Sequence, residues 1–378
     1  MGERDVSALK YWIQKGVGIG ALAIAGAFLL FILNAGDVAN RDFISYWAAG
    51  RQLVHGANPY DATAVLSIEK EAGWSQAAAL IMRNPPGALL LLVAPIGLLE
   101  PVFAGAVWSL AIIVSLMLAV RLIWTMEGKQ EGRRHLIGYC FGPALACVLA
   151  GQTGTFVLLG LALFLFWERS RPLLAGCALS LCAVKPHLFV PFGLVLLLWS
   201  VRGRAYRLLA GVAIGAAATS SFALILRPQL FSDYLALLRT AGVEDEFLPV
   251  FGSLLRIVIA RDATWLQFVP AVVACVWAVW FYRRHRQHWD WSEQGAWIVL
   301  VSVCAAPYAW FTDEAILLPA LLHGIYKSDR HQGSLLWFGV PAAIALVMVL
   351  FGVPMASGYY IWTPWAWLGC YYGLTRNS

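Results

Sequence analysis

Asp42 is the residue of this chain whose type and position best suit acid–base chemistry. It follows an apolar stretch long enough to cross a membrane and lies in a run of aromatic residues and arginines at 41–51, with a turn-forming sequence at 58–61. A carboxylate at a membrane surface is partly desolvated, which raises its affinity for a proton and suits a general base. We therefore predict that Asp42 takes a proton from a substrate hydroxyl. The alternative is that Asp42 caps the helix predicted to follow it.

Lys185 is the second candidate for chemistry, because it lies between two apolar runs and precedes Pro186. A lysine at such a place is costly in a membrane and is a functional candidate by default. Its ammonium group suits a phosphate as a point charge, and the neighbouring His187 is a second candidate phosphate donor. The alternatives are a lysine that extends to the membrane surface from a helix end and a histidine packed inside the protein.

Three further sites of polar residues stand at predicted helix ends. Arg256 ends a long loop, and its guanidinium group can clamp a phosphate with two hydrogen bonds; a solvated loop arginine is the alternative. Asp313 and Glu314 lie in a turn, where they can orient a substrate or Lys185, or cap the next helix. Gln152 lies in a Gly-Gln turn and either contacts a sugar or is a simple turn residue.

The composition indicates a helical membrane protein. The 378 residues are 60% hydrophobic and 13% charged, whereas average globular chains carry about 25% charged residues. Only helices and closed barrels satisfy the backbone in lipid, and the long apolar runs lack the alternation of barrel strands. The formal charge of +6 does not indicate a nucleic-acid partner, because the basic residues cluster in short loops between apolar runs.

The cysteines do not predict a cross-linked or metal-binding protein. All seven lie inside apolar segments, and none forms a CxxC pair. Disulfide frameworks and zinc sites use cysteines in paired spacings outside such segments. We therefore expect no disulfide bond and no zinc site.

The apolar runs predict a single integral membrane domain, residues 1–378, with about 12 membrane-spanning helices. Several runs are shorter than the roughly 20 residues of an ordinary span, so they are extended by flanking residues or are broken helices. The short run Gly87–Leu99 is interpreted as a half-helix or re-entrant piece. The spans are expected at about 17–34, 102–124, 136–150, 154–167, 172–184, 187–200, 208–226, 264–282, 294–311, 315–326, 335–353 and 359–373.

The basic loops at 125–135, 201–207 and 283–286 set the predicted orientation, because loops rich in lysine and arginine face the cytoplasm. Two long segments, 35–86 and 227–263, then face the outside and are expected to carry short interfacial helices. Within the first segment, apolar and polar residues separate onto two sides of an amphipathic helix at 43–54, and a second short helix follows at 62–72. Such helices can hold a site at the membrane surface.

The chain resembles glycosyltransferase family 87 in a series of short motifs that runs over residues 17–330. The first block is the most specific, and the later blocks add to it in order along the chain. The motifs are Asp42-Phe43, Tyr46-Trp47, Ala49-Gly50-Arg51, Asn58-Pro59-Tyr60-Asp61, Asn84-Pro85-Pro86, Gly151-Gln152, Lys185-Pro186, Phe251-Gly252-Ser253-Leu254-Leu255-Arg256 and Pro307-Tyr308 through Asp313.

The resemblance implies an all-α, polytopic enzyme with the GT-C-type glycosyltransferase fold and interfacial helices after the first span. It also implies transfer of a hexose, usually mannose, from a polyprenyl-phosphate sugar to a hydroxyl of a lipid or glycan on the extracytoplasmic side of the bacterial inner membrane. Asp42 maps onto the base and Lys185 onto the residue near the donor phosphate. Some members that transfer mannose carry a Trp-x-His pattern after the late proline, where this chain has Trp310-Phe311-Thr312-Asp313, which leaves the acceptor and the sugar open.

The transfer reaction predicted from these residues assigns the remaining site residues and the stereochemistry. His187 and Arg256 join Lys185 at the donor phosphate. A monophosphate leaving group held by cations requires no metal and no cofactor, and a β-linked donor gives an α-linked product by inversion. Retention needs a second carboxylate at the anomeric carbon, for which Asp313 is the candidate. The residues expected to bind the substrate are Tyr46, Arg51, Asn58, Tyr60, Gln152 and Asp313.

Two other functions fit the composition. A transporter or flippase of a lipid-linked sugar explains the charges within the membrane equally well, but the chain lacks the paired broken repeats typical of transporters. A membrane scaffold without catalytic activity is the second alternative, and it predicts that Asp42→Asn leaves function intact. Formation of a new covalent product in liposomes distinguishes a transferase from a transporter.

Overall fold

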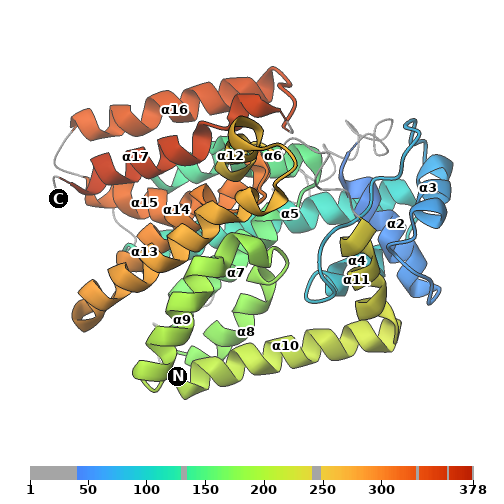
Figure 1. The fold of residues 1–378 in the computed structure, drawn as a ribbon, viewed down its shortest axis with the longest axis horizontal. Coiled ribbons are helices and arrows are strands. Elements are labelled where there is room, and N and C mark those ends of the chain that lie inside the picture. The colour runs from blue at the N-terminus through green and yellow to red at the C-terminus, as the bar shows by residue number, and fades with distance from the viewer. Residues whose placement is uncertain (1–40, 129–133, 241–247, 329–331, 356, 377–378) are drawn as a thin grey trace, which may run out of the picture.

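The computed structural model of the chain describes residues 41–128, 134–240, 248–328, 332–355 and 357–376. Within these ranges the protein is helical and contains no β-strand (Figure 1). The predicted first span, 17–34, and parts of the basic loop 125–135 and of the segment 227–263 lie outside the described residues. The described ranges agree with the predicted all-α class.

The helices follow one another through short connections. Figure 1 shows α2, α3 and α11 together at the right-hand end of the molecule, and α13, α14, α15 and α17 toward the left. The α-helices are α2 (Phe43–Val54), α3 (Ala62–Glu71), α4 (Leu90–Ile96), α5 (Pro101–Met126), α6 (Gly142–Ala150), α7 (Gly154–Trp167), α8 (Pro172–Cys182), α9 (Val190–Arg202), α10 (Tyr206–Leu226), α11 (Leu230–Thr240), α12 (Phe251–Ile259), α13 (Val269–His285), α14 (Gln294–Cys304), α15 (Leu318–Lys327), α16 (Gln332–Leu350) and α17 (Thr363–Thr375).

The described residues also contain six short 3₁₀ helices, and some of them carry residues of the site. The 3₁₀ helices used below are η3 (Pro186–Phe189), η4 (Thr264–Phe268) and η6 (Phe311–Leu317). Each of these directly precedes an α-helix, α9, α13 and α15 respectively. α9, α13 and α15 each have a proline in the first turn. Proline has no backbone N–H, and the N–H groups of the first turn have no partner within the helix, so proline is favoured at a helix start.

Three described helical stretches are long and apolar enough to cross a membrane: Pro101–Met126, Tyr206–Leu226 and Thr264–His288. The first has 26 residues, about 39 Å at 1.5 Å per residue, and exceeds the roughly 30 Å hydrocarbon core. Other apolar helices have only 10–17 residues. The predicted count of about 12 spans is therefore not confirmed. Within the run predicted as a half-helix, α4 has 7 residues, too few for a crossing.

The most extensive contact between two helices, that of α8 with α10, depends on small residues. α8 and α10 cross so closely that a Cβ atom added to Gly176 would overlap the backbone of α10 at Leu208, and one added to Gly211 would overlap α8 at Leu173. Glycine at both positions lets the two backbones approach, which is how helices commonly associate in lipid. The contact fixes α8, whose C-terminal end leads to Lys185.

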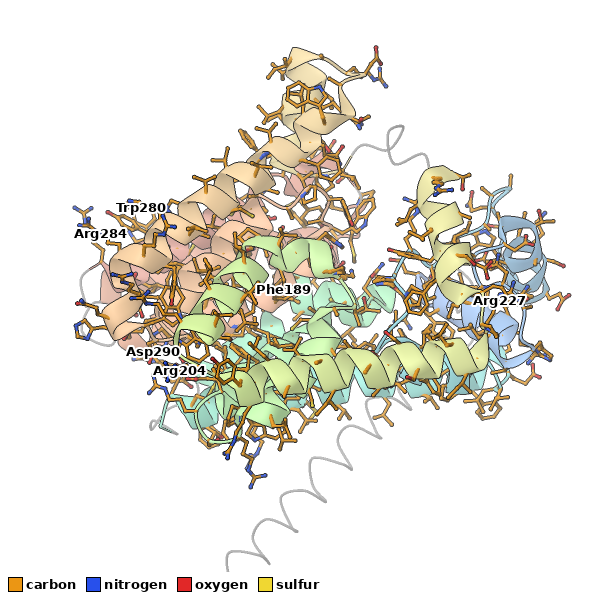
Figure 2. All side chains as sticks on the ribbon, turned by 60° about the horizontal axis from the view of Figure 1, so that its bottom comes forward. Phe189, Arg204, Arg227, Trp280, Arg284 and Asp290 are labelled. Atoms are coloured by element: carbon orange, nitrogen blue, oxygen red, sulfur yellow. The ribbon has the colours of Figure 1, made fainter. Side chains whose placement is uncertain are left out.

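The basic residues of the described loops gather at one end of the helices. Arg202 ends α9 and Arg286 follows α13, and both lie close enough to Tyr282 to affect it electrostatically. Figure 2 shows Arg204 and Arg284 on one side of the molecule and Arg227, which follows α10, on the opposite side. The loops 201–207 and 283–286 therefore share one end, as the predicted topology requires.

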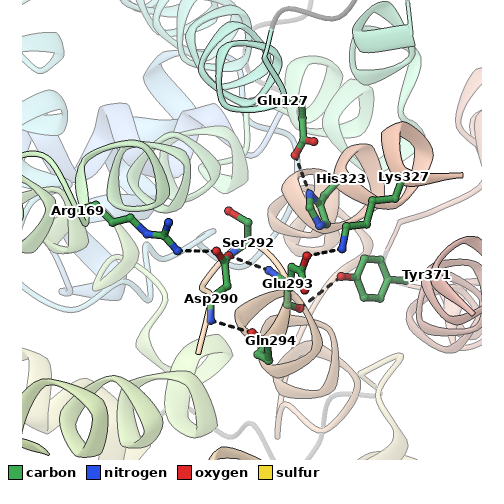
Figure 3. Close-up of polar contacts among 9 residues, drawn as sticks. All are labelled: Glu127, Arg169, Asp290, Ser292, Glu293, Gln294, His323, Lys327 and Tyr371. Atoms are coloured by element: carbon green, nitrogen blue, oxygen red, sulfur yellow. Dashed lines mark hydrogen bonds and ion pairs between the residues drawn. The ribbon is translucent and has the colours of Figure 1, made fainter. Parts of the chain in front are cut away.

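Polar contacts connect five helices at this basic end (Figure 3). His323 Nδ1 lies 2.7 Å from Glu127 Oε1, joining α15 to the residue after α5. Arg169 donates to Asp290 Oδ2 at 2.5 Å, which joins the end of α7 to the segment before α14. Lys327 forms an ion pair with Glu293. A small cavity beside Glu127 and His323 opens here and not at Asp42.

The predicted helices of the segment 35–86 form, but the first is more buried than expected. α2 spans the predicted 43–54, and α3 covers Ala62–Glu71 of the predicted 62–72. Ten of the 12 residues of α2 are buried, including Ser45 and Gln52 on its predicted polar side. α2 therefore packs inside the protein and does not present a polar side to solvent, whereas its position at a membrane surface stays a prediction. α4, α5 and α3 cover it, and its small residues, such as Gly50, allow close packing.

Candidate functional site

Asp42 precedes α2, but its side chain does not cap that helix. Its Oδ2 atom instead accepts a hydrogen bond of 2.6 Å from the side-chain amide of Gln152, 110 positions along the chain. The capping role considered for Asp42 is therefore wrong. Its carboxylate is oriented by a turn between two other helices, which leaves it available for chemistry.

Gln152 lies in a turn whose backbone is fixed on several sides. Gly151 ends α6 in the left-handed conformation (φ 76°), a position that favours glycine. The indole of Trp108 donates to the Gly151 carbonyl at 2.7 Å, and a Cβ atom at Gly151 would meet Phe43. The Gln152 side chain thus leaves this turn in a defined direction.

The Gln152 amide connects Asp42 with Lys185. Its oxygen accepts a hydrogen bond from the Tyr46 hydroxyl at 3.1 Å and lies 3.5 Å from Lys185 Nζ, at the outer limit of a hydrogen bond. A protonated lysine can only donate, so the amide oxygen faces Lys185 and the amide nitrogen faces Asp42. One uncharged side chain therefore contacts a cation and an anion at once.

Lys185 forms a buried ion pair with Asp313 Oδ1. Oδ2 of Asp313 accepts a hydrogen bond of 2.9 Å from the Trp310 backbone amide, so Asp313 also caps the start of η6. The Asn84 side chain donates to the Val184 carbonyl at 3.0 Å and fixes the backbone before Lys185. We call Asp42, Gln152, Lys185 and Asp313 the polar network.

The polar network is exposed at one end and buried at the other. Lys185 is 6% exposed and Asp313 is 1% exposed, whereas Asp42 and Gln152 are both half-buried. A molecule that approaches from solvent therefore meets Asp42 and Gln152 first, and the ion pair lies behind them. The interpretation of Lys185 as a lysine that extends to the membrane surface is wrong, because its ammonium group points into the protein and onto Asp313.

Burial raises the pKa of Asp42 above its ordinary value, while the hydrogen bond from Gln152 and the charges of Lys185 and Arg41 act in the opposite direction. The pKa of Lys185 is also raised: burial is the largest single effect and lowers it, but the charge and hydrogen bond of Asp313, together with Tyr46 and Cys147, outweigh burial. Lys185 therefore stays charged. Asp42 gains the higher proton affinity that general-base catalysis near neutral pH requires.

Arg41 is a nearby cation whose role the sequence did not indicate. Its guanidinium group donates to the carbonyls of Leu149 at 2.7 Å and Val148 at 2.5 Å, in the last turn of α6. Carbonyls at a helix C-terminus lack partners within the helix and attract cations. Arg41, the residue directly before Asp42, therefore attaches this part of the backbone to α6, the helix that precedes Gln152. With Lys185, it balances the two carboxylates of the site.

His187 and Arg256 lie outside the polar network. The His187 ring packs on Tyr308, with ring centroids 3.8 Å apart, so the packed alternative describes its position. Arg256 is only 5% exposed, which contradicts a solvated loop arginine. It donates to the Gln267 side chain at 3.1 Å, and Gln267 donates to the Pro307 carbonyl at 2.7 Å. Both residues therefore border the segment that leads to Asp313.

Among the other predicted substrate-binding residues, only Tyr46 joins the network; its ring also stacks on Trp108 with centroids 5.0 Å apart. The Arg51 guanidinium lies over Trp47 at 5.8 Å. The Asn58 side chain accepts from the Tyr60 amide at 3.0 Å and forms a turn. The Tyr60 hydroxyl donates to the Asn84 carbonyl at 3.1 Å. Arg51 and Asn58 thus make contacts within the segment 35–86, and Tyr60 also packs against Tyr234 of α11, with ring centroids 5.5 Å apart. These contacts lie outside the network.

The described residues contain no group of three or more histidine, cysteine or acidic residues placed to hold a metal ion. All seven cysteines are free thiols. Cys147 lies next to the network, where its thiol donates to the Thr312 carbonyl at 3.2 Å. The thiol is fully buried in an apolar helix, an environment in which cysteines are poorly reactive.

Comparison with known families identifies the chain. The profile of glycosyltransferase family 87 matches residues 83–311, more than half of the sequence. Gln152 and Lys185 lie inside this region, Asp42 precedes it and Asp313 follows it by two positions. No curated protein and no solved structure matches the chain. The chain belongs to glycosyltransferase family 87 and is a membrane glycosyltransferase, which takes a sugar from a donor to an acceptor.

Proposed function

We propose that this enzyme transfers a hexose, with mannose as the first candidate, from a polyprenyl-phosphate sugar to a hydroxyl of a lipid or glycan acceptor. The reaction takes place on the extracytoplasmic side of the bacterial inner membrane. The observation that carries the proposal is the polar network, which joins a half-buried carboxylate to a buried cation within one chain of contacts. Its position at the end of the helices opposite the loops 201–207 and 283–286 supports the sidedness.

In the proposed reaction Asp42 acts as the general base. Its ionised carboxylate takes the proton of the acceptor hydroxyl as the acceptor oxygen bonds to the anomeric carbon. The bond between that carbon and the donor phosphate oxygen breaks, and the electron pair leaves with the phosphate. Attack opposite the leaving group inverts the configuration. Asp313 is paired with Lys185, and this pairing argues against its use as the second carboxylate of a retaining mechanism.

Lys185 contributes a positive charge to the departing phosphate. Counted alone, Asp42, Lys185 and Asp313 carry one net negative charge, which would repel an anionic donor. Arg41 supplies the second cation near Asp42, so the four groups together are neutral. When the donor binds, the Lys185 side chain either turns from Asp313 toward the phosphate, or stays paired and attracts the phosphate from the far side of Gln152. His187 and Arg256 border the same segment and are assigned to the outer part of the phosphate site.

The family favours sugar transfer over sugar transport. A flippase would move the lipid-linked sugar without forming a new bond, whereas family membership implies glycosyl transfer. The departure from the Trp-x-His pattern at 310–313 leaves the acceptor open, because this segment contributes Asp313 to the network rather than a histidine to the acceptor.

The test uses purified enzyme with a panel of labelled polyprenyl-phosphate hexoses and membrane extracts as the acceptor source, with products identified by mass spectrometry. We expect one donor to give a labelled product, and Asp42→Asn to lower turnover by about 10²-fold or more, the scale of general-base catalysis. Asp61→Asn is the matched control, because Asp61 caps α3 through the backbone amides of Thr63 and Ala64 and lies outside the network. Full activity of Asp42→Asn would remove the base assignment.

A further inference from the structure

Glu314 is a buried acid next to Asp313 that takes no part in the polar network. It is 3% exposed, and its carboxyl group contacts α17 rather than Lys185. Asp313 and Glu314 are neighbours in η6, so this short helix presents one acid to the network and the other to the C-terminal helix. The region matched by the family profile ends at 311, before both acids and before α17.

The hydrogen bonds around Glu314 favour one position for a proton. Thr363 Oγ1 is 2.6 Å from Glu314 Oε1 and 2.7 Å from the carbonyl oxygen of Tyr360. A hydroxyl group has one proton and a carbonyl oxygen has none. Two such short contacts are both satisfied when Thr363 donates to Tyr360 and Glu314 donates to Thr363. The indole of Trp367 donates to the other carboxyl oxygen at 2.7 Å.

The surroundings of Glu314 also disfavour its charged form. Burial raises its pKa to about 8, and the charge of Asp313 acts in the same direction, while the contacts with Thr363 and Trp367 oppose the rise. The groups that face it from other elements are the thiol of Cys304 and the hydroxyl of Tyr360, both of which sense its charge. Neither is a cation, so no opposite charge on these elements compensates an ionised Glu314.

We propose that Glu314 is a protonated carboxylic acid that positions Asp313 by joining η6 to α17. The inference rests on the proposed function only in its effect on turnover; the protonation state stands on the hydrogen bonds alone. A neutral Glu314 leaves Asp313, the partner of Lys185, as the single negative charge of η6. The C-terminal helix then acts on the site through a neutral hydrogen-bonded contact.

The first experiment measures stability and needs no substrate. Glu314→Gln keeps a donor toward Thr363 and an acceptor for Trp367, so it imitates the protonated acid. A raised pKa in the folded state contributes stability that is complete below about pH 4.5 and is lost as the pH rises through about 8. The melting temperature of the wild type in detergent should therefore fall relative to that of Glu314→Gln between pH 5 and pH 8.5. Parallel curves for the two proteins would overturn the proposal.

The second experiment observes the proton directly. The infrared difference spectrum between wild type and Glu314→Gln at pH 6.5 should contain the C=O stretching band of a protonated carboxylic acid, and ¹³C labelling of glutamate should shift that band. A carboxylate band in its place would refute a protonated Glu314. Glu293→Gln is the matched control, because Glu293 is paired with Lys327 at the opposite end of the protein and is expected to give a carboxylate difference.

Turnover tests the positioning role. Glu314→Gln should keep wild-type turnover near neutral pH, whereas Thr363→Val, which removes the contact with Glu314, should lower turnover with little change in the KM for the donor. Loss of turnover in Glu314→Gln with normal melting would overturn the positioning role. If the wild type itself fails to use any polyprenyl-phosphate sugar, the proposed function fails, while the melting and infrared results still decide the protonation state.

Discussion

Gln152→Leu is the substitution that most directly tests the polar network. It removes the amide that donates to Asp42 at 2.6 Å and accepts from Tyr46, while a leucine of similar length fills its place. The bond from Gln152 stabilises the ionised form of Asp42, so its loss raises the pKa of Asp42 further. A hydrogen bond to a charged group is worth about 1.5–3 kcal/mol, and about 1.4 kcal/mol corresponds to one pKa unit. The expected rise is therefore about one to two units.

The assay is the pH dependence of kcat/KM, which reports ionisation of the free enzyme. Because the base must be ionised, the acidic limb should move upward by about one to two units, so that turnover falls at low pH and recovers at high pH. Gln267→Leu is the matched control: it removes a buried glutamine that bonds to Arg256 and the Pro307 carbonyl but does not contact Asp42. If the acidic limb of the kcat/KM profile of Gln152→Leu lies at the same pH as that of the wild type, the reasoning is refuted. An equal shift of this limb in Gln267→Leu would also refute it.

Three further predictions concern stability and the donor. Lys185→Ala leaves Asp313 buried without its partner and should lower the free energy of unfolding by about 3–5 kcal/mol. The same substitution should weaken use of the donor more than use of the acceptor. A donor KM equal to that of the wild type would contradict the role of Lys185. Burial raises the pKa of Glu69 to about 7, so its stabilising contribution is complete below its ordinary pKa and is lost as the pH rises through about 7; melting of Glu69→Gln should lack this slope. Gly176→Val should prevent the α8–α10 contact, and a correctly folded yield on size-exclusion chromatography equal to that of the wild type would show that the contact tolerates a side chain.

The sequence predicted those parts of the fold that depend on local signals. α7 begins and ends at the predicted residues because a glycine turn precedes it and polar residues follow its apolar run. α2 likewise covers the predicted 43–54. The sequence did not predict the burial of α2, since its moderate alternation of apolar and polar residues says nothing about how many other helices cover it. The predicted span count stays unconfirmed for a related reason: short apolar helices inside a protein and true crossings have similar compositions.

The candidate site shows the same division. Asp42, Gln152, Lys185 and Asp313 each stood out because a polar residue interrupts an apolar context, and the structure brings these four side chains together. Their catalytic roles stay predictions. Arg51, which belongs to the same family motif as Asp42, packs on Trp47 instead. Neighbours in a helical motif point in different directions, so shared membership of a motif does not imply a shared site.

The roles of Arg41 and Glu314 depend on contacts between distant segments. Arg41 anchors α6 through carbonyls more than 100 positions away, and Glu314 bonds to side chains about 50 positions away. Every residue has a backbone carbonyl, so the sequence does not show which carbonyls accept a hydrogen bond from Arg41. In the same way, a threonine or tryptophan in an apolar helix does not show which side chain it will contact. Such contacts become visible only in three dimensions.

The fixed orientation of the Gln152 amide has a stereochemical consequence for Asp42. The two carboxyl oxygens of Asp42 are not equivalent, because the Gln152 amide nitrogen donates a hydrogen bond to Oδ2. A proton taken from the acceptor is then expected on Oδ1, so the nucleophile must approach from the face of the carboxylate that Gln152 does not cover. The direction from which an acceptor hydroxyl reaches Asp42 would thus depend on the orientation of a single uncharged amide.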